Sequence, residues 1–168
     1  EETTTFALIP MAKEKLDIPL IAAGGIATGR GMLAAIVLGA DGVQVGSRFV
    51  VSEESSAHRA FKNAITEAKD GDTFLTLKEL APVRLLKNKF LDDLLELYKS
   101  NPSKEDLIKL LGRARAKIGM FEGDLIEGEL EIGQISGLIN EVKSAAEIIK
   151  DMVSEYEDAR QEMITLGL

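Results

Sequence analysis

The sequence contains no cysteine, no tryptophan and a single histidine. The absence of cysteine excludes disulfides, thiolate-bound metals, iron–sulfur clusters and a cysteine nucleophile. One histidine leaves little scope for a metal cage or a Ser-His-Asp triad. Aromatic residues make up only 5% of the 168 residues, so a core must be built mainly from Leu, Ile, Val, Ala and Met.

Long apolar runs and an excess of positive charge are also absent. No run reaches the ~18 residues that a membrane-spanning helix needs, and the first residues lack the basic and apolar regions of a secretory signal peptide. The net charge is −8, from 28 acidic and 20 basic residues, which does not suit binding to the phosphate backbone of nucleic acids. We therefore expect a cytoplasmic protein with no nucleic-acid or membrane partner.

Helical and extended patterns alternate over the first 70 residues. The short extended runs are almost wholly apolar, as in strands of a parallel sheet that are buried on both faces. Thr28 is a suitable N-cap and Gly39 a suitable C-cap for the second helix. The pattern predicts helices over 6–16, 32–38 and 57–68 and strands over 18–23 and 41–48. Such alternation with short connections favours βα units around a parallel sheet.

The pattern changes after Gly71. Two short segments, 73–78 and 82–86, are predicted to be extended, and the rest is mainly helical. Capping boxes beginning at Ser103 and Ser144 predict one helix from 104 to about 121 and a long helix near the C-terminus. The long helix carries an apolar stripe that needs a partner surface.

Each of the two predicted strands ends in a glycine-bearing turn. The first turn contains Gly24 and Gly25, and the second contains Gly46 followed by Ser47. Backbone N–H groups in such turns can point at an anion, helped by the positive end of the next helix; the alternative is a tight turn that needs positive φ. Many (β/α)₈ barrels bind phosphate with the loops after strands 7 and 8 and a short extra helix, which we expect at 51–55.

The turns and the segments around them resemble a known family. Segments 22–31, 38–49, 122–125 and 133–139 are similar to the FMN-dependent nitronate monooxygenase family, formerly called 2-nitropropane dioxygenase. This family includes the FMN-dependent enoyl-acyl-carrier-protein reductase II. Within the family, Ala57-His58 and the 122–139 stretch resemble the reductase branch more closely. The resemblance covers nearly the whole chain.

The resemblance implies an α/β fold, the C-terminal part of a TIM-like (β/α)₈ barrel. Residues 1–70 would carry strands 7 and 8 with the FMN phosphate loops, and residues 71–168 a mainly helical C-terminal segment that packs on or beside the barrel. Such a barrel takes about 250 residues and eight strands, and two strands cannot close it. We therefore expect a partial view of a longer protein, in which the run at 19–23 faces water on at least one side.

The implied cofactor is FMN, with NAD(P)H as the electron donor in the reductase branch. Ser47 replaces the Thr more usual at its position and keeps the hydroxyl. Arg30, at a helix start, could add to anion binding but is more readily explained as a solvated side chain. The residues expected to hold the FMN phosphate are Ala23, Gly24, Gly25, Gln44, Val45, Gly46 and Ser47.

Other candidate residues are fewer. The resemblance places Gln134 near the active site, where it would orient flavin or substrate; the alternative is a loop glutamine that caps a helix. The family's active-site histidine lies in a motif expected upstream of residue 1. His58 does not align with it and is interpreted as an ordinary surface or packing residue, so the catalytic residue stays unknown. The carboxylates at 122–131 lack the spacing of a metal loop.

The resemblance implies NAD(P)H-dependent reduction of enoyl-acyl carrier protein as the activity. One alternative is nitronate monooxygenase, which oxidises alkyl nitronates with O₂; another is a non-catalytic barrel fragment that acts only with an N-terminal half-barrel. The expected partners are a small-molecule or acyl-carrier-protein-linked substrate, that half-barrel and a second copy of the chain. Basic clusters at 84–89 and 113–117 are either docking sites for an acidic carrier protein or solvated faces.

Overall fold

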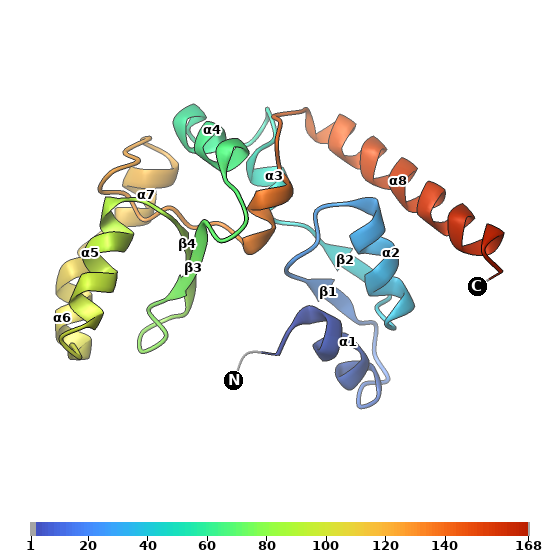
Figure 1. Cartoon of the computed structure of the whole chain (residues 1–168), viewed down its shortest axis with the longest axis horizontal. Coiled ribbons are helices and arrows are strands. Elements are labelled where there is room, and N and C mark those ends of the chain that lie inside the picture. The colour runs from blue at the N-terminus through green and yellow to red at the C-terminus, as the bar shows by residue number, and fades with distance from the viewer. Residues whose placement is uncertain (1–2, 168) are drawn as a thin grey trace. The chain divides into compact units, whose positions relative to one another are not determined.

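The computed structural model describes residues 3–167 and divides into two compact units (Figure 1). The first unit holds the chain up to Glu54 and again from Lys143, and the second unit is Ser55–Val142. None of the helices within residues 3–167 combines the length and the apolar character that crossing a membrane requires.

The first unit alternates helix and strand, as predicted. Its two strands pair in parallel, with Ile21 opposite Gly42 and Ala23 opposite Gln44. The elements are α1 (Thr5–Lys13), β1 (Ile21–Ala23), α2 (Gly29–Val37), β2 (Gly42–Gln44), α3 (Ser47–Val50) and α8 (Ala145–Thr165). The first unit therefore has the parallel βα arrangement of a barrel segment, but its two-stranded sheet does not close a barrel within the described residues.

Only one face of this sheet is covered. Ala22 is buried, whereas Ile21 is 56% exposed and Ala23 is exposed as well. The prediction of a strand buried on both faces is therefore wrong for β1, and the expectation that the run would face water on one side is confirmed. The covered face packs against a core of Ile9, Ala22, Ile26, Ala35 and Ala40.

The predicted caps of the second helix are confirmed. The Thr28 hydroxyl accepts a hydrogen bond from the Gly31 N–H at 3.1 Å, and Gly39 follows the helix with a φ of 111°, where glycine is favoured. The capping box at Ser144 opens α8, which lies along α2 (Figure 1). Ile148 and Met152 of the predicted α8 stripe are buried, whereas other apolar residues of that stripe stay exposed.

The short extra helix lies earlier than predicted. It forms at Ser47–Val50, directly after Gly46, whose carbonyl accepts hydrogen bonds from the Phe49 and Val50 N–H groups. The prediction of a helix over 51–55 is wrong because this segment pairs with Lys143, two residues before α8. Ser52 forms a parallel bridge with Lys143, and the Glu53 N–H donates to the Lys143 carbonyl at 2.9 Å.

The second unit joins a β-hairpin to several helices, and both predicted extended segments form that antiparallel hairpin. One hydrophobic core cluster of this unit is formed by Leu77, Leu85, Phe90, Leu91, Leu94 and Leu107. The elements are α4 (Arg59–Glu67), β3 (Thr73–Thr76), β4 (Val83–Leu86), α5 (Lys89–Tyr98), α6 (Lys104–Leu111), α7 (Arg115–Met120) and the 3₁₀ helix η1 (Gln134–Leu138).

The single helix predicted from 104 to about 121 is wrong, because two helices occupy this stretch. The capping box at Ser103 does open α6, but Gly112 and Ala114 have positive φ values of 66° and 56° and stop the helix. The Arg115 guanidinium then turns back and donates to the carbonyls of Leu110 and Leu111, at 3.1 and 2.8 Å. These carbonyls belong to the last turn of α6 and have no partner further along that helix.

Candidate phosphate-binding site

The two glycine turns lie at the same edge of the parallel sheet. Because Ala23 is opposite Gln44 in neighbouring parallel strands, the residues that follow them leave the sheet side by side. Ligands of open parallel sheets bind outside the carboxyl ends of the strands. The pairing therefore brings together the two turns that the sequence singled out separately.

The first turn depends on glycine. Gly24 and Gly25 have φ values of 95° and 73°, in the left-handed region that other residues rarely adopt. The Thr5 hydroxyl donates a hydrogen bond to the Gly24 carbonyl at 3.0 Å and so holds the turn to the start of α1. The turn is tight, as the simpler interpretation required, and it also leaves its N–H groups beside the second turn.

The second turn is open. Gly46 has a φ of −102°, and a Cβ built on it would meet no atom within 4 Å. Ser47 begins α3 and is half-buried, and Val45 is half-buried too, whereas Ala23 and Gln44 are exposed. The space around Gly46 thus leaves the backbone of this turn accessible, which suits an anion with several oxygens.

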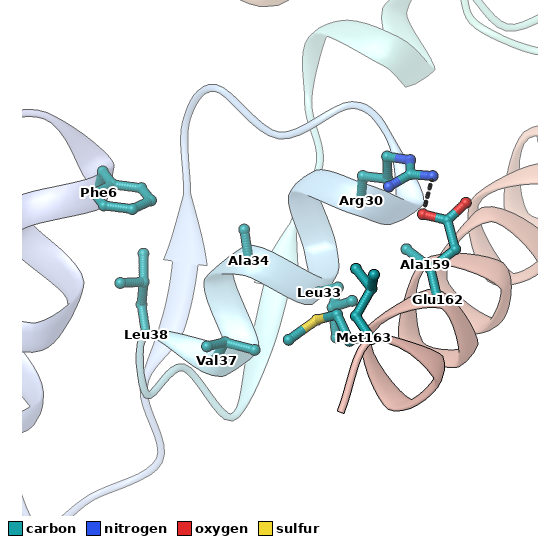
Figure 2. Close-up of a pocket in the computed structure, with 10 residues that line it drawn as sticks. Phe6, Arg30, Leu33, Ala34, Val37, Leu38, Ala159, Glu162 and Met163 are labelled. Carbon is teal, nitrogen blue, oxygen red and sulfur yellow. Dashed lines mark hydrogen bonds and ion pairs between the residues drawn. The ribbon is translucent and has the colours of Figure 1, made fainter. Parts of the chain in front are cut away.

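The positive end of α2 is already occupied, which corrects one expectation. The first N–H of α2, on Gly29, donates to the Glu155 carboxylate of α8 at 2.8 Å. Arg30 forms an ion pair with Glu162 of α8 at 2.6 Å (Figure 2), and both side chains are largely exposed. A protein carboxylate therefore occupies the helix end that was expected to help attract an anion, and a second carboxylate neutralises Arg30.

Thr5 and Glu155 are contributors that the sequence did not reveal. Each is separated from its partner by 19 or more residues, and each lies in a stretch rich in its own residue type, Thr3–Thr5 and the acidic α8. No spacing rule distinguishes either residue from its neighbours. Only the packing of α1 and α8 identifies them.

An apolar pocket of about 380 Å³ lies between α2 and α8 (Figure 2). Apart from Arg30 and Glu162, its lining is apolar, and none of the residues that line it belongs to either glycine turn. The pocket is lined by Phe6, Arg30, Leu33, Ala34, Val37, Leu38, Ala159, Glu162, Met163 and Leu166.

Gln134 belongs to the second unit, whereas the two turns belong to the first. It is exposed and is the first residue of η1, whose N-cap is Gly133. Ser136, two residues later, is fully buried, and its hydroxyl has no hydrogen-bond partner among the described residues. The role of Gln134 near flavin or substrate stays a prediction.

His58 caps a helix and packs against a loop of the second unit. Its Nδ1 atom accepts a hydrogen bond from the Ala60 N–H at 3.1 Å and caps α4. Its backbone N–H donates to the Met120 carbonyl at 2.7 Å. Gly123 packs so closely on the imidazole that a Cβ there would lie 2.2 Å from Nδ1. The imidazole therefore joins two segments of the second unit.

Most residues of the basic clusters are paired within the second unit. Lys89 contacts Asp93 and Glu127, and these carboxylates raise the pKa of Lys89. Arg115 pairs with Glu127 and lies over the Phe90 ring, 4.5 Å from its centre. Lys87 and Lys117 are paired with Asp72 and Glu122. These pairs reduce the positive charge that the clusters present to a partner.

The carboxylates of the 122–131 stretch form no metal centre: no group of three or more potential ligands occurs within residues 3–167. Glu129 in this stretch is only 8% exposed. Burial and, to a smaller extent, the nearby Glu131 carboxylate raise the pKa of the Glu129 carboxyl, Arg115 lowers it, and the net result is a pKa of about 6.

Known proteins are similar to this chain in sequence and in fold. A family profile described as "Nitronate monooxygenase" matches residues 1–155. A probable nitronate monooxygenase of Staphylococcus saprophyticus is 34% identical over 155 residues, which are 92% of this chain and 43% of that protein. The chain therefore spans about half the length of the curated relatives it matches.

Two solved structures show the same relationship. FabK from Thermotoga maritima is 38% identical with a TM-score of 0.89, covering 99% of this chain and 53% of that one. Nitroalkane oxidase from Streptomyces ansochromogenes is 29% identical with a TM-score of 0.77, covering 95% of this chain and 45% of that one. The two-unit chain thus matches about half of each of these longer proteins.

Proposed function

This chain belongs to the nitronate monooxygenase family of FMN-dependent oxidoreductases, and we propose that its two glycine turns hold the phosphate of FMN. The observation that carries the proposal is the adjacency of the turns at the carboxyl ends of parallel β1 and β2. The N–H groups of Gly24, Gly25 and Gly46 would donate to the phosphate oxygens. Ala23, Gln44, Val45 and Ser47 would border the same edge.

The proposed reaction is the reduction of the C2–C3 double bond of an enoyl thioester carried by acyl carrier protein. The chemistry that FMN supplies when bound is hydride transfer from NAD(P)H to the β-carbon of the substrate. The part of this chain is to bind and orient: backbone donors fix the phosphate end of the cofactor, and the open surface at Gly46 admits it without displacing a side chain. Gln134 is the residue that we propose for contact with flavin or substrate.

Support for the enoyl reductase branch comes from the solved structures. The likeness to FabK is greater than the likeness to nitroalkane oxidase in identity, in TM-score and in the share of this chain covered. Nitronate monooxygenase is the second candidate, because the curated relatives carry that name. The expected homodimer, the carrier-protein partner and the N-terminal half-barrel stay predictions.

The phosphate site is tested by placing a carboxylate in each turn. Gly46→Asp puts a negative charge at an open position without backbone strain, and Gly46→Asn is its neutral counterpart of the same shape. We expect Gly46→Asp to reduce bound FMN at least tenfold, because two like charges about 4 Å apart near a protein surface repel by about 4 kcal/mol, and a tenfold change needs only about 1.4 kcal/mol. The measurement is the visible absorption of the purified protein and identification of the released chromophore.

Gly25→Asp should have the same effect, with an added cost because its φ is 73°. Gly71→Asp is the matched control, since Gly71 has a φ of 78° and open space around it in the second unit. Unchanged FMN content in Gly46→Asp would refute the assignment of the turns. A wild-type protein that takes up no added FMN would refute flavin binding by this chain alone.

The two activities are separated by their electron donors. Oxidation of NADH that depends on a crotonyl thioester would support the enoyl reductase. Turnover of propionate 3-nitronate with O₂ and without NADH would support the monooxygenase. Neither activity in a preparation that binds FMN would favour the third possibility, a barrel fragment that acts only with a further half-barrel.

A further inference from the structure

We propose that α8 fixes both glycine turns, and that Glu155 is a positioning residue of the phosphate site although it belongs to neither turn. The inference rests on the proposed function, because it concerns the same two turns. It assigns a role to the acidic C-terminal helix, which the sequence presented only as an amphipathic helix in need of a partner.

The first contact holds the segment that leaves the first turn. Gly29 begins α2 only four residues after Gly25, and its N–H donates to the Glu155 carboxylate at 2.8 Å. Between these two glycines, Ile26 and Ala27 are each 6% exposed. The path from the turn to the helix is therefore held by buried side chains and, at its end, by a charge-assisted hydrogen bond, which is stronger than a neutral one.

The backbones of α2 and α8 also touch at this point. A Cβ on Gly29 would lie 2.2 Å from the Met152 carbonyl oxygen and 2.3 Å from the Tyr156 nitrogen. No side chain separates the helices here, so a shift of α8 must move the start of α2. Farther along, Leu33 of α2 and Met163 of α8 face each other (Figure 2).

The second contact holds the segment that leaves the second turn. After α3, the Glu54 carboxylate accepts a hydrogen bond from the Ala145 N–H at 2.8 Å, and Ala145 is the first residue of α8. The preceding pair, Glu53 and Lys143, is joined through the backbone at 2.9 Å. The arrangement is reciprocal: α8 gives a carboxylate to the first N–H of α2 and receives one at its own first N–H.

This arrangement determines the distance between the two sets of phosphate donors. A phosphate that binds N–H groups from both turns requires them to be placed within about 0.5 Å of the productive geometry. Affinity is lost when the binding groups must be ordered at the moment of binding. Weakening either carboxylate contact should therefore weaken FMN binding, although neither carboxylate belongs to a glycine turn.

The test compares three variants. Glu155→Ala and Glu54→Ala each remove the carboxylate that bonds the first N–H of a helix. Glu157→Ala is the charge-matched control, because Glu157 lies on α8 and, among the residues that the structure describes, Arg160 on the same helix is its ion-pair partner, at 3.6 Å. Two quantities are measured: amide hydrogen exchange in the ligand-free protein, and the FMN dissociation constant from quenching of flavin fluorescence.

We expect Glu155→Ala to speed exchange at Gly31, and Glu54→Ala to speed exchange at Glu53, by about tenfold each, which corresponds to the loss of one hydrogen bond to a charged group. Neither of these amides touches the replaced side chain: Gly31 bonds to Thr28 and Glu53 to Lys143. The FMN dissociation constant should rise about tenfold in both variants. The Gln variants at the same positions, which keep an acceptor, should restore most of both properties, and Glu157→Ala should match the wild type.

Unchanged exchange at Gly31 in Glu155→Ala would overturn the inference, and so would faster exchange with unchanged FMN affinity. If Glu155→Ala does not fold, Glu155→Asp provides the same test, because it keeps the charge but shortens the side chain by one methylene. A wild-type protein that binds no FMN would refute the proposed function instead. The exchange data would then still decide whether α8 fixes the turns.

Discussion

The buried carboxyl of Glu129 makes a quantitative prediction about how stability depends on pH. Glu129 is 8% exposed, and its N–H donates to the Arg115 carbonyl at 3.1 Å. The Arg115 guanidinium is directed to other acceptors, the carbonyls of Leu110, Leu111 and Glu127. Burial and the charge of Glu131 therefore prevail, and the pKa of Glu129 rises from 4.5 to about 6.

The sign of the effect follows from where the proton binds more tightly. Between pH 4.5 and about 6, the folded protein keeps a proton on Glu129 that the unfolded chain releases, so stability falls as the pH rises through this window. Above this window the ionised, buried carboxylate destabilises the fold by about 2 kcal/mol, the equivalent of the difference between the two pKa values. Below pH 4.5 the penalty is absent.

Glu129→Gln should therefore stabilise the protein by about 2 kcal/mol at pH 7.5 and have little effect at pH 4. Glu131→Gln removes only the repulsive neighbour, so it should stabilise in the same direction by a smaller amount. The measurement is urea-induced unfolding followed by circular dichroism at several pH values. A stabilisation by Glu129→Gln that stays constant from pH 4 to pH 7.5 would refute the electrostatic explanation.

Two further predictions concern close packing and capping. Gly29→Ala should lower the unfolding free energy by about 3 kcal/mol or more, because its Cβ would overlap the α8 backbone. Gly46→Ala is the control: the space there is open, so it should lower the unfolding free energy by less than about 1 kcal/mol. Similar urea midpoints for the two variants would contradict the packing explanation. His58→Ala should lower the unfolding free energy by about 1 kcal/mol, because the α4 cap is lost, whereas His58→Asn should change it little, because Asn is a good N-cap. If urea unfolding shows equal destabilisation in the two variants, capping is not the role of His58.

Local sequence signals predicted most of the elements of both units. Thr28 and the boxes at Ser103 and Ser144 mark helix starts because their side-chain oxygens bond N–H groups within the first turn. The predictions failed where a distant contact decided the conformation. The segment at 51–55 is not helical because it pairs with Lys143, and the stretch from 104 is interrupted where Arg115 turns back onto the end of α6.

The candidate site was predicted in part. Two glycine turns after two apolar strands indicated an anion site, and their adjacency required only that the strands pair in parallel, which the alternating pattern favoured. Which groups would attract the anion could not be predicted from the sequence. The sequence indicated the α2 helix end and favoured a solvated Arg30. In the structure, Glu155 of the distant α8 bonds that helix end, and the largely exposed Arg30 pairs with Glu162.

The sequence by itself determined the βα order, the family, and the positions of the glycine turns, because these depend on local periodicity, on residues tolerant of positive φ and on motif order. Only the tertiary structure decided which charged groups and helix ends pair with one another. Those outcomes depend on contacts between residues more than 100 positions apart, such as Gly29 with Glu155. The sequence contains many acidic side chains, and any of them could accept a hydrogen bond from the first N–H of α2. Which one does so is decided only when α8 packs against α2.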